Sequence, residues 1–283
     1  MKTLTRVKAR WLVAAGLLLC GLLALAFTVR KLGQPPDAAW QRIQAQKVFV
    51  VASDASYPPF ESLDANGALF GFDVDLADEI GRRWGVQVHY ENITYDALLG
   101  ALVAGRDDAV ISAFVPQPDR TREVSYTGAY FTSGTVAVIR QAAPRGQVFG
   151  SDPQAWASGK TLAVEYGGDG DVLARQWARQ LAGQTGGITI LRKSTPADAL
   201  LAVDNHQADA ALVDAISAYD FLLSHPALQL AGPPLNPEQY VIAVNVKSTT
   251  LLRQLEQTLA AMQADGTLTA LKLKWFGKAG TGN

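Results

Sequence analysis

The sequence predicts an α/β protein with parallel sheets flanked by helices, and three observations support this fold class. Short runs rich in β-branched residues alternate with helical patterns along most of the chain. This alternation occurs before and after a polar, glycine-containing stretch at residues 141–150, which predicts two units. Residues 95–113 and 197–215 also align without a gap and are identical at seven of nineteen positions, which favours two similar lobes.

The first unit is expected to open with a strand at Lys47–Ser53, which ends at a proline-containing turn. A helix is predicted to follow from Gly71 to Gly85, with Asp73 as its N-cap. Strand, helix and strand then alternate through residues 86–112. This order is typical of an open α/β sheet.

Arg120 is the first candidate binding residue. Two prolines end the strand predicted at residues 109–111, and Pro118 favours the start of a short helix. Arg120 is therefore expected just past the C-terminal edge of a strand. Ligands bind at this edge in open α/β sheets, and a guanidinium there can hold a carboxylate through two parallel hydrogen bonds.

The second unit repeats the outline of the first. A strand at residues 161–165 leads into a glycine-rich turn at 166–171 and a helix. A later strand, 210–213, ends at Asp214. The chain then closes with a strand and two helices that reach residue 277. A charged residue therefore follows a predicted strand in each unit: Arg120 in the first and Asp214 in the second.

The N-terminus carries an export signal. Four positive charges precede an apolar run from Trp11 to Val29, and residues 1–30 are expected to be a signal peptide or a membrane anchor. Small residues favour cleavage after Ala26, whereas lipidation at Cys20 is a weaker alternative. Residues 31–45 are interpreted as a spacer. The lobes should therefore lie in the periplasm or on the extracellular face of the cytoplasmic membrane.

Charge and composition exclude several functions. The formal net charge is −1, and residues 1–26 hold four of the positive charges and no acid, so the rest carries −1 minus 4, or −5. An acidic domain is unsuited to nucleic acid. The exported part contains no cysteine, and its histidines have no metal-ligand spacing. We expect no metal, no cofactor and no catalytic residue.

Four segments together resemble one protein family. They are the segment from Ala109 to Arg120, the turn at residues 54–61, the helix start Gly71-Phe-Asp-Val-Asp75 and the C-terminal Lys274-Trp-Phe-Gly277. We call the first of these the arginine loop. In this order they resemble bacterial extracellular solute-binding proteins of family 3, the polar amino-acid receptors of ABC importers. The resemblance runs from about residue 47 to residue 277.

The resemblance implies a two-lobed, periplasmic-binding-protein-like fold of type II. The first lobe would be discontinuous, with residues 46–130 followed by 241–283. The second lobe would occupy 131–240, and two hinge crossings would fall at 130–134 and 236–240. Ligand would be buried between the lobes.

The resemblance also implies binding roles for matching residues. Arg120 would grip the ligand α-carboxylate, and Asp214 would receive the α-ammonium group. Tyr57 and Tyr95 would form aromatic walls, and Asp54 would meet the ligand side chain. Ordinary packing is the alternative for the two tyrosines, and a helix N-cap is the alternative for Asp214.

The remaining candidate residues include departures from the family pattern. Val115 replaces a usual hydroxyl residue, so only its backbone N–H could support the carboxylate. Gly168 and Asp169 replace a threonine-containing turn, although amides there could bind an anion at a helix start. Ser112 and Ala113, which lie in the arginine loop, complete the predicted ligand-binding set.

The expected function is capture of an amino acid between closing lobes and delivery to the permease subunits of an ABC transporter, by a monomer. One alternative is a cyclohexadienyl dehydratase of the same fold, with Asp171 in the place of its acidic catalytic residue. Another is a ligand-sensing receptor domain, which retention of the N-terminal segment would favour.

Overall fold

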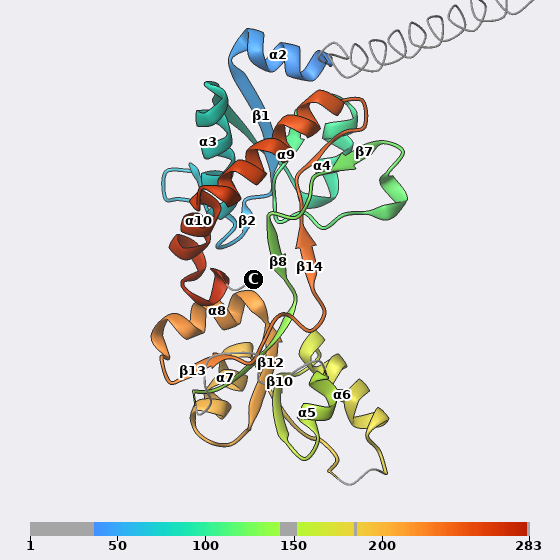
Figure 1. The fold of residues 1–283 in the computed structure, drawn as a ribbon, viewed down its shortest axis with the longest axis vertical. Helices are drawn as coiled ribbons and strands as arrows, with labels where there is room; N and C mark the ends of the chain where they lie inside the picture. The colour runs from blue at the N-terminus through green and yellow to red at the C-terminus, as the bar shows by residue number, and fades with distance from the viewer. Residues whose placement is uncertain (1–36, 142–151, 184–185, 282–283) are drawn as a thin grey trace, which may run out of the picture.

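The computed structural model describes residues 37–141, 152–183 and 186–281, which form two α/β lobes joined by two strands (Figure 1). The predicted signal or anchor at residues 1–30, with Cys20, lies outside these residues. No helix within the described ranges has both the length and the apolar character needed to cross a bilayer. The predicted α/β class is confirmed.

The first lobe contains a five-stranded sheet in the order β5-β1-β6-β15-β7. Its first three strands are parallel, and β15, from the C-terminal part of the chain, pairs antiparallel to β6. The strands are β1 (Val48–Ser53), β5 (Gln87–Asn92), β6 (Ala109–Val110), β7 (Val124–Tyr126) and β15 (Ala243–Asn245). A small sheet joins β2 (Ser56–Tyr57), β3 (Glu61–Leu63) and β4 (Leu69–Phe70). The helices of this lobe are α3 (Phe72–Trp84), α4 (Tyr95–Val103), α9 (Thr249–Ala264) and α10 (Thr267–Phe276), with η1 (Pro118–Arg120) and a final turn η2 (Ala279–Thr281).

The second lobe has a matching sheet in the order β11-β10-β12-β9-β13. Here β10 is parallel to both β11 and β12, and β9 runs antiparallel to β12. The strands are β9 (Thr135–Arg140), β10 (Thr161–Glu165), β11 (Thr189–Lys193), β12 (Ala210–Asp214) and β13 (Leu228–Leu230). The helices are α5 (Pro153–Ala157), α6 (Asp169–Gln180), α7 (Pro196–Asp204) and α8 (Ala215–Ser224).

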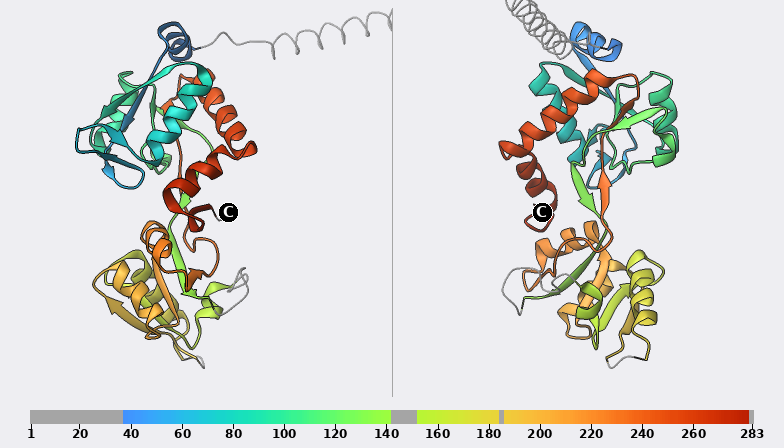
Figure 2. Two further views of the ribbon diagram at one scale, coloured as in Figure 1. Left: turned by 90° about the vertical axis from the view of Figure 1, so that its left-hand side faces the viewer. Right: turned by 45° about the vertical axis from the view of Figure 1, so that its right-hand side comes forward.

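Two antiparallel strands connect the lobes. β8 (Phe131–Ser133) pairs with β14 (Glu238–Tyr240), with Thr132 opposite Gln239. We call these two strands the hinge pair. The views in Figure 2 show them crossing the waist between the lobes.

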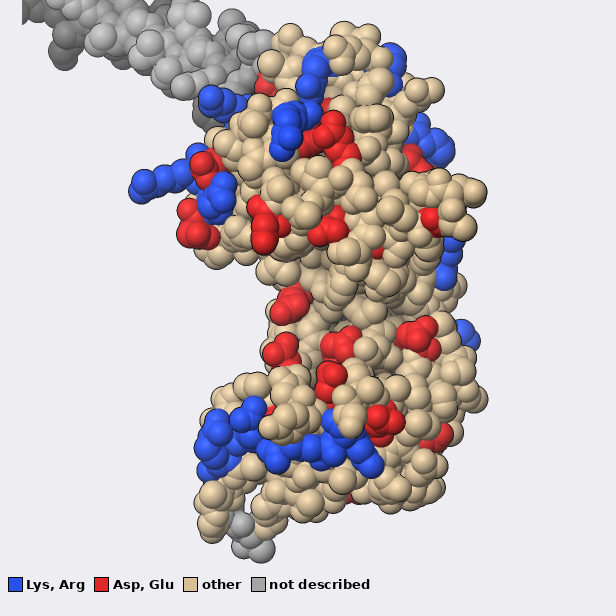
Figure 3. Space-filling model, turned by 180° about the vertical axis from the view of Figure 1, so that it is seen from behind, with Lys and Arg blue, Asp and Glu red and all other residues tan. Residues whose placement is uncertain are grey.

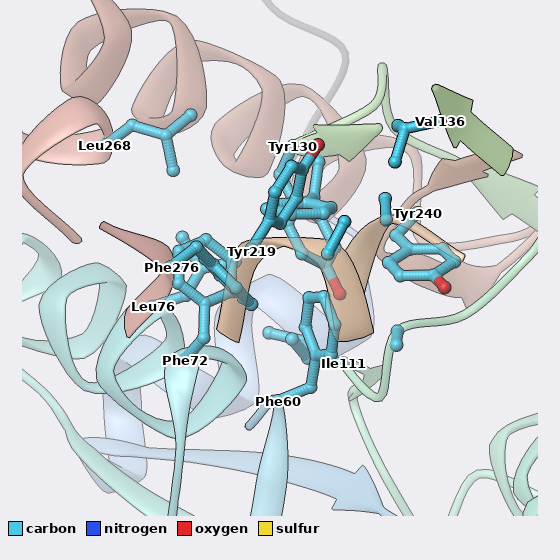
Figure 4. Close-up of a cluster of buried hydrophobic side chains, with 14 of the residues drawn as sticks. Phe60, Phe72, Leu76, Ile111, Tyr130, Val136, Tyr219, Tyr240, Leu268 and Phe276 are labelled. Carbon is cyan, nitrogen blue, oxygen red and sulfur yellow. The ribbon is translucent and has the colours of Figure 1, made fainter. Parts of the chain in front are cut away.

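An aromatic cluster lies where the hinge pair meets the first lobe (Figure 4). The ring centroid of Phe131, on β8, is 5.1 Å from that of Phe60 and 4.7 Å from that of Phe276. Tyr219, on α8 of the second lobe, reaches the same cluster at 6.4 Å from Phe131. Side chains from both lobes therefore bury one another around the hinge.

Two sequence expectations are wrong near the start of the fold. Residues predicted as a spacer form helix α2 (Ala38–Gln46), which Asp37 caps and which buries Ile43 completely. Good helix formers directly follow the proline pair, so the helix starts as soon as the prolines end. The predicted N-cap Asp73 instead lies inside α3, whose N-cap is Gly71.

Candidate functional site

A cavity of about 320 Å³ opens at the C-terminal edge of the first sheet. In the parallel pairing of β1 with β6, Ala52 lies opposite Val110, so the segments that carry Asp54 and Ser112 leave the sheet side by side. Six of the ten predicted ligand-binding residues line the cavity. The lining residues are Asp54, Ser56, Tyr57, Glu61, Tyr95, Ser112, Ala113, Val115 and Tyr240.

Two predicted aromatic residues form walls of this cavity. Tyr57 stacks on Phe60 at 5.5 Å, and Tyr95 stacks on Phe114 at 5.4 Å, between ring centroids. Tyr57 is nevertheless 43% exposed and Tyr95 38% exposed. Burial raises the pKa of both hydroxyls, so both rings stay neutral at physiological pH. Each ring is supported by the core and also available to a ligand.

Asp54 joins the cavity wall to the start of α4. Its Oδ2 accepts a hydrogen bond from the Tyr95 amide at 2.8 Å, and its own amide donates to Ser112 Oγ at 3.0 Å. Asp54 is only half-buried. These contacts fix the carboxylate at the cavity while leaving acceptor capacity for a ligand donor.

Glu61 is a wall residue that the sequence analysis missed. It is 1% exposed, and its Oε1 accepts a hydrogen bond from Ser112 Oγ at 2.9 Å. Asp73, also 1% exposed, accepts from the Ala113 amide at 2.5 Å and from the Tyr130 hydroxyl at 2.8 Å. Burial, followed by the charge of Asp73, raises the pKa of Glu61 far above its usual range. Glu61, at the cavity wall, and Asp73, which does not line the cavity, therefore form a buried carboxyl pair.

The Asp73 contact changes what Ala113 can contribute. Its amide is already bonded to Asp73, so only the rest of the residue faces the cavity. Ala113 also has a positive φ of 43°, a backbone conformation that costs free energy for a residue with a Cβ. The carboxylate of Asp73 helps to hold this bend in place.

Arg120 has the predicted local structure but does not line the cavity. It ends η1, shortly after the β6 strand, as the proline pattern indicated. Its Nε donates to Glu123 Oε2 at 2.6 Å, and its side chain is 34% exposed. The structure therefore places the guanidinium at the edge of the first lobe, paired with a carboxylate of its own loop.

Three predicted residues lie on the second lobe. In the pairing of β10 with β12, Val164 lies opposite Leu212, so the turn after β10 and Asp214 leave the same sheet edge. Asp214 Oδ1 accepts from the Ser217 amide at 2.8 Å and caps α8, which is the alternative role considered for it. Gly168 is the N-cap of α6, and Asp169 is its first residue. None of the three lines the described cavity.

The two sets of residues lie on different lobes, each at the C-terminal edge of its sheet. Figure 3 shows a hollow at the waist between the lobes, with Asp and Glu side chains along it. Tyr166, which was not among the predicted binding residues, is 75% exposed in the turn after β10. An aromatic residue directly before a glycine pair was the signal available in the sequence.

Asp171, the alternative catalytic residue, is held in an ion-pair network. Its Oδ1 accepts from Arg192 Nε at 2.8 Å, and its Oδ2 lies 3.3 Å from Arg175 Nε. Burial favours a higher pKa, but the hydrogen bonds from Arg192 and Gly167 outweigh it, and the pKa of Asp171 is lowered. A carboxylate held ionised is a poor proton donor.

Residues 37–141, 152–183 and 186–281 contain no group of three or more potential metal ligands.

Two lobes, a hinge pair and a cavity at the edge of a sheet together make up the architecture of a type II periplasmic binding protein. The chain matches the family of bacterial extracellular solute-binding proteins, family 3, over residues 49–278, and it belongs to that family. The ABC transporter arginine-binding protein 1 of Escherichia coli (strain K12) is 27% identical over 227 residues, which are 78% of this chain and 88% of that relative.

Two solved structures show the same fold. The L-cystine solute receptor of Neisseria gonorrhoeae, in its unliganded open conformation, aligns with a TM-score of 0.72 at 23% identity, over 86% of this chain and 98% of that one. An ancestral cyclohexadienyl dehydratase aligns with a TM-score of 0.69 at 20% identity, over 86% and 98%. At these identities the likeness concerns the fold alone.

These comparisons confirm the predicted family and the type II fold. They also confirm the predicted receptor function at the level of the family, because the named sequence relatives are binding proteins of amino-acid ABC transporters and not enzymes.

Proposed function

We propose that this chain captures an amino acid with a cationic side chain between its lobes and delivers it to the permease of an ABC importer. The observation that carries this proposal is the composition of the cavity wall. Among the described residues, this wall contains two carboxyl groups, those of Asp54 and Glu61, and no lysine, arginine or histidine. The name of the arginine-binding relative supports the same ligand class.

The aromatic walls suit such a ligand. Tyr57 and Tyr95 offer partly exposed faces beside Asp54. A guanidinium or ammonium group placed against an aromatic face gains about 0.5 to 2 kcal/mol, and a nearby carboxylate adds a charge-assisted hydrogen bond. The side chain of the ligand would therefore point into the first lobe.

We assign the α-carboxylate to Arg120 and the α-ammonium to Asp214. Arg120 uses Nε for Glu123, which leaves the terminal nitrogens of its guanidinium for a ligand. Asp214 uses Oδ1 as a cap and keeps Oδ2. Because these residues stand on different lobes, a zwitterion can pair with both only when the lobes close.

Closure would then be a shift in a conformational equilibrium about the hinge pair. Moving such an equilibrium from 1:99 to 99:1 requires about 5.5 kcal/mol of differential binding free energy. Two desolvated charge-assisted contacts and burial of the aromatic walls are of that order. The closed form would be the one that docks on the permease.

The test separates binding from folding. Asp214→Asn should retain the helix cap, since Asn caps as well as Asp does, but should abolish arginine-induced thermal stabilisation. Arg120→Gln should do the same, while Glu123→Gln serves as the matched control that retains the guanidinium. Full affinity for arginine in Asp214→Asn would reduce Asp214 to a cap and contradict the assignment.

We also propose that residues 1–30 export the protein, which would place the lobes in the periplasm or outside the cytoplasmic membrane. N-terminal sequencing of the mature protein distinguishes a chain cleaved after Ala26 from an anchored one. An anchored chain with no transport phenotype would favour the sensing alternative.

A further inference from the structure

A chain of hydrogen bonds leads from the cavity wall to the hinge. Ser112 Oγ accepts from the Asp54 amide at 3.0 Å and donates to Glu61 Oε1 at 2.9 Å. The Glu61 carboxyl in turn interacts with that of Asp73, so a proton between the two would complete the chain, and Asp73 Oδ2 accepts from the Tyr130 hydroxyl at 2.8 Å. Tyr130 directly precedes β8 of the hinge pair. These contacts connect the cavity wall to the hinge pair, about which we propose that the lobes rotate.

The carboxyl pair in this chain requires a proton. Glu61 Oε2 and Asp73 Oδ1 are buried and have no hydrogen-bond donor among the described residues, so a proton between them would satisfy both. The other titratable groups that interact with the pair are Asp54, which follows β1, and four tyrosines, Tyr57, Tyr90, Tyr95 and Tyr130. None of them is a cation. Two ionised carboxylates side by side in a buried site would be strongly unfavourable.

The proton belongs to Glu61. Burial raises the pKa of both carboxyls, but Asp73 accepts from the Ala113 amide and the Tyr130 hydroxyl, and these bonds favour its ionised form. Glu61 has one such donor, Ser112. In the free protein Glu61 is thus a neutral acid that donates to the Asp73 carboxylate.

We propose that Glu61 determines specificity for the end of the ligand side chain, and that a cationic ligand displaces the Glu61 proton to solvent. This inference rests on the proposed function. An N–H of the ligand guanidinium or ammonium would donate to the Glu61 carboxyl as its O–H bond breaks, and the proton would pass to a buffer base. The ligand cation then takes the place of the proton as the positive charge beside the pair.

The experiment compares arginine with citrulline, its neutral isostere, by titration calorimetry of the full chain at pH 7. Binding enthalpies measured in phosphate and in Tris, which differ in ionisation enthalpy, give the number of protons released. We expect about one proton for arginine and none for citrulline. Because the free protein holds the proton, the Kd for arginine should tighten about tenfold per pH unit between about pH 6 and 8.

Glu61→Gln is the diagnostic variant. The amide retains the volume and a donor toward Asp73 but cannot ionise, so arginine should release no proton and its Kd should lose its pH dependence. Asp54→Asn is the matched control: it removes the other carboxylate of the wall, weakens arginine binding and leaves the proton count near one. If Glu61→Gln fails to fold, the number of protons that the wild-type protein releases on binding arginine tests the proposal by itself.

The outcomes separate the inference from the proposed function. Arginine binding without proton release overturns the inference and leaves the proposed function standing. Binding of citrulline but not arginine overturns both the inference and the cationic preference. Failure of every amino acid to bind overturns the proposed function, and the inference with it.

Discussion

Tyr166 is the most exposed large hydrophobic side chain among the described residues. It stands 75% exposed in the turn after β10, at the sheet edge from which Asp214 also emerges. Such a ring can cover a ligand held on the opposite lobe only after closure. Its solvent exposure in this structure therefore fits a contact that forms when the lobes meet.

We expect Tyr166→Ala to weaken arginine binding by about 1 to 2 kcal/mol, or roughly 5- to 30-fold in Kd, because an aromatic contact is lost on closure. Titration calorimetry measures the effect, and Tyr166→Phe should restore most of it. The melting temperature of the free protein should not change. Wild-type affinity in the alanine variant would show that this ring stays in solvent after ligand binds.

The cavity residues that sequence analysis identified are those fixed by local strand ends. Asp54 and Ser112 each follow a short β-rich run, so their meeting at one sheet edge follows from parallel pairing. Glu61 gave no such signal, because a carboxyl in a hairpin looks solvated until α3 and the Ser112 segment cover it. The side-chain direction of Arg120 was equally inaccessible, since it depends on its pairing with Glu123.

At Asp73, a tertiary contact overrides the local preference of aspartate for the N-cap position. Its place before an apolar helical pattern favoured an N-cap, but Gly71 takes that position with a φ of 145°. A Cβ there would overlap the carbonyl of Phe60, so close approach of the hairpin requires glycine. The helix therefore starts two residues earlier than an Asp73 cap would give, and Asp73 is buried within its first turn.

At the scale of elements, strand and helix alternation was predictable because its periodicity is local, whereas helix α2 was not. This short helix depends on a cap and on docking. Asp37 Oδ1 accepts from the Trp40 amide at 2.9 Å, and Oδ2 accepts from the Thr250 and Leu251 amides at the start of α9. One carboxylate thus satisfies the N-termini of two helices.

Asp37→Ala should lower the free energy of unfolding by about 2 kcal/mol, since it removes a cap and leaves amides of α9 without a partner. Urea unfolding measures this change. Asp37→Asn, which retains an acceptor at the α2 cap, should cost less. Because α2 precedes the N-terminal end of β1 and the cavity lies beyond its C-terminal end, arginine affinity should be unchanged. An equal loss of stability in both variants would contradict the capping role.

At the scale of the whole molecule, a contact between the lobes is expected to oppose the proposed closure. Helix α10 of the first lobe touches α8 of the second, with the ring of Phe276 6.2 Å from that of Tyr219. Leu223 on α8 packs so closely against Gly277 that a Cβ there would overlap it. The waist hollow of Figure 3 lies on the opposite side of the hinge pair from this contact in Figure 1. Rotation that closes the hollow must therefore loosen the packing of α8 against α10.

Weakening this contact should favour the closed form. Leu223 is 61% exposed, so Leu223→Ala should change stability little while removing part of the α8–α10 packing. If the contact contributes about 1 kcal/mol to the open form, the Kd for arginine should tighten about fivefold, because apparent affinity scales with the closed fraction. Small-angle scattering should also show a more compact free protein.

The matched control is Leu201→Ala, which truncates an exposed leucine on α7 within the second lobe and should leave the Kd unchanged. Glu61→Gln combined with Leu223→Ala then tests whether the buried carboxyl pair and the α8–α10 contact affect binding independently. Independent action predicts additive changes in the free energy of arginine binding. Weaker binding in Leu223→Ala, with a free protein no more compact, would mean that the α8–α10 contact also forms in the closed state and does not oppose it.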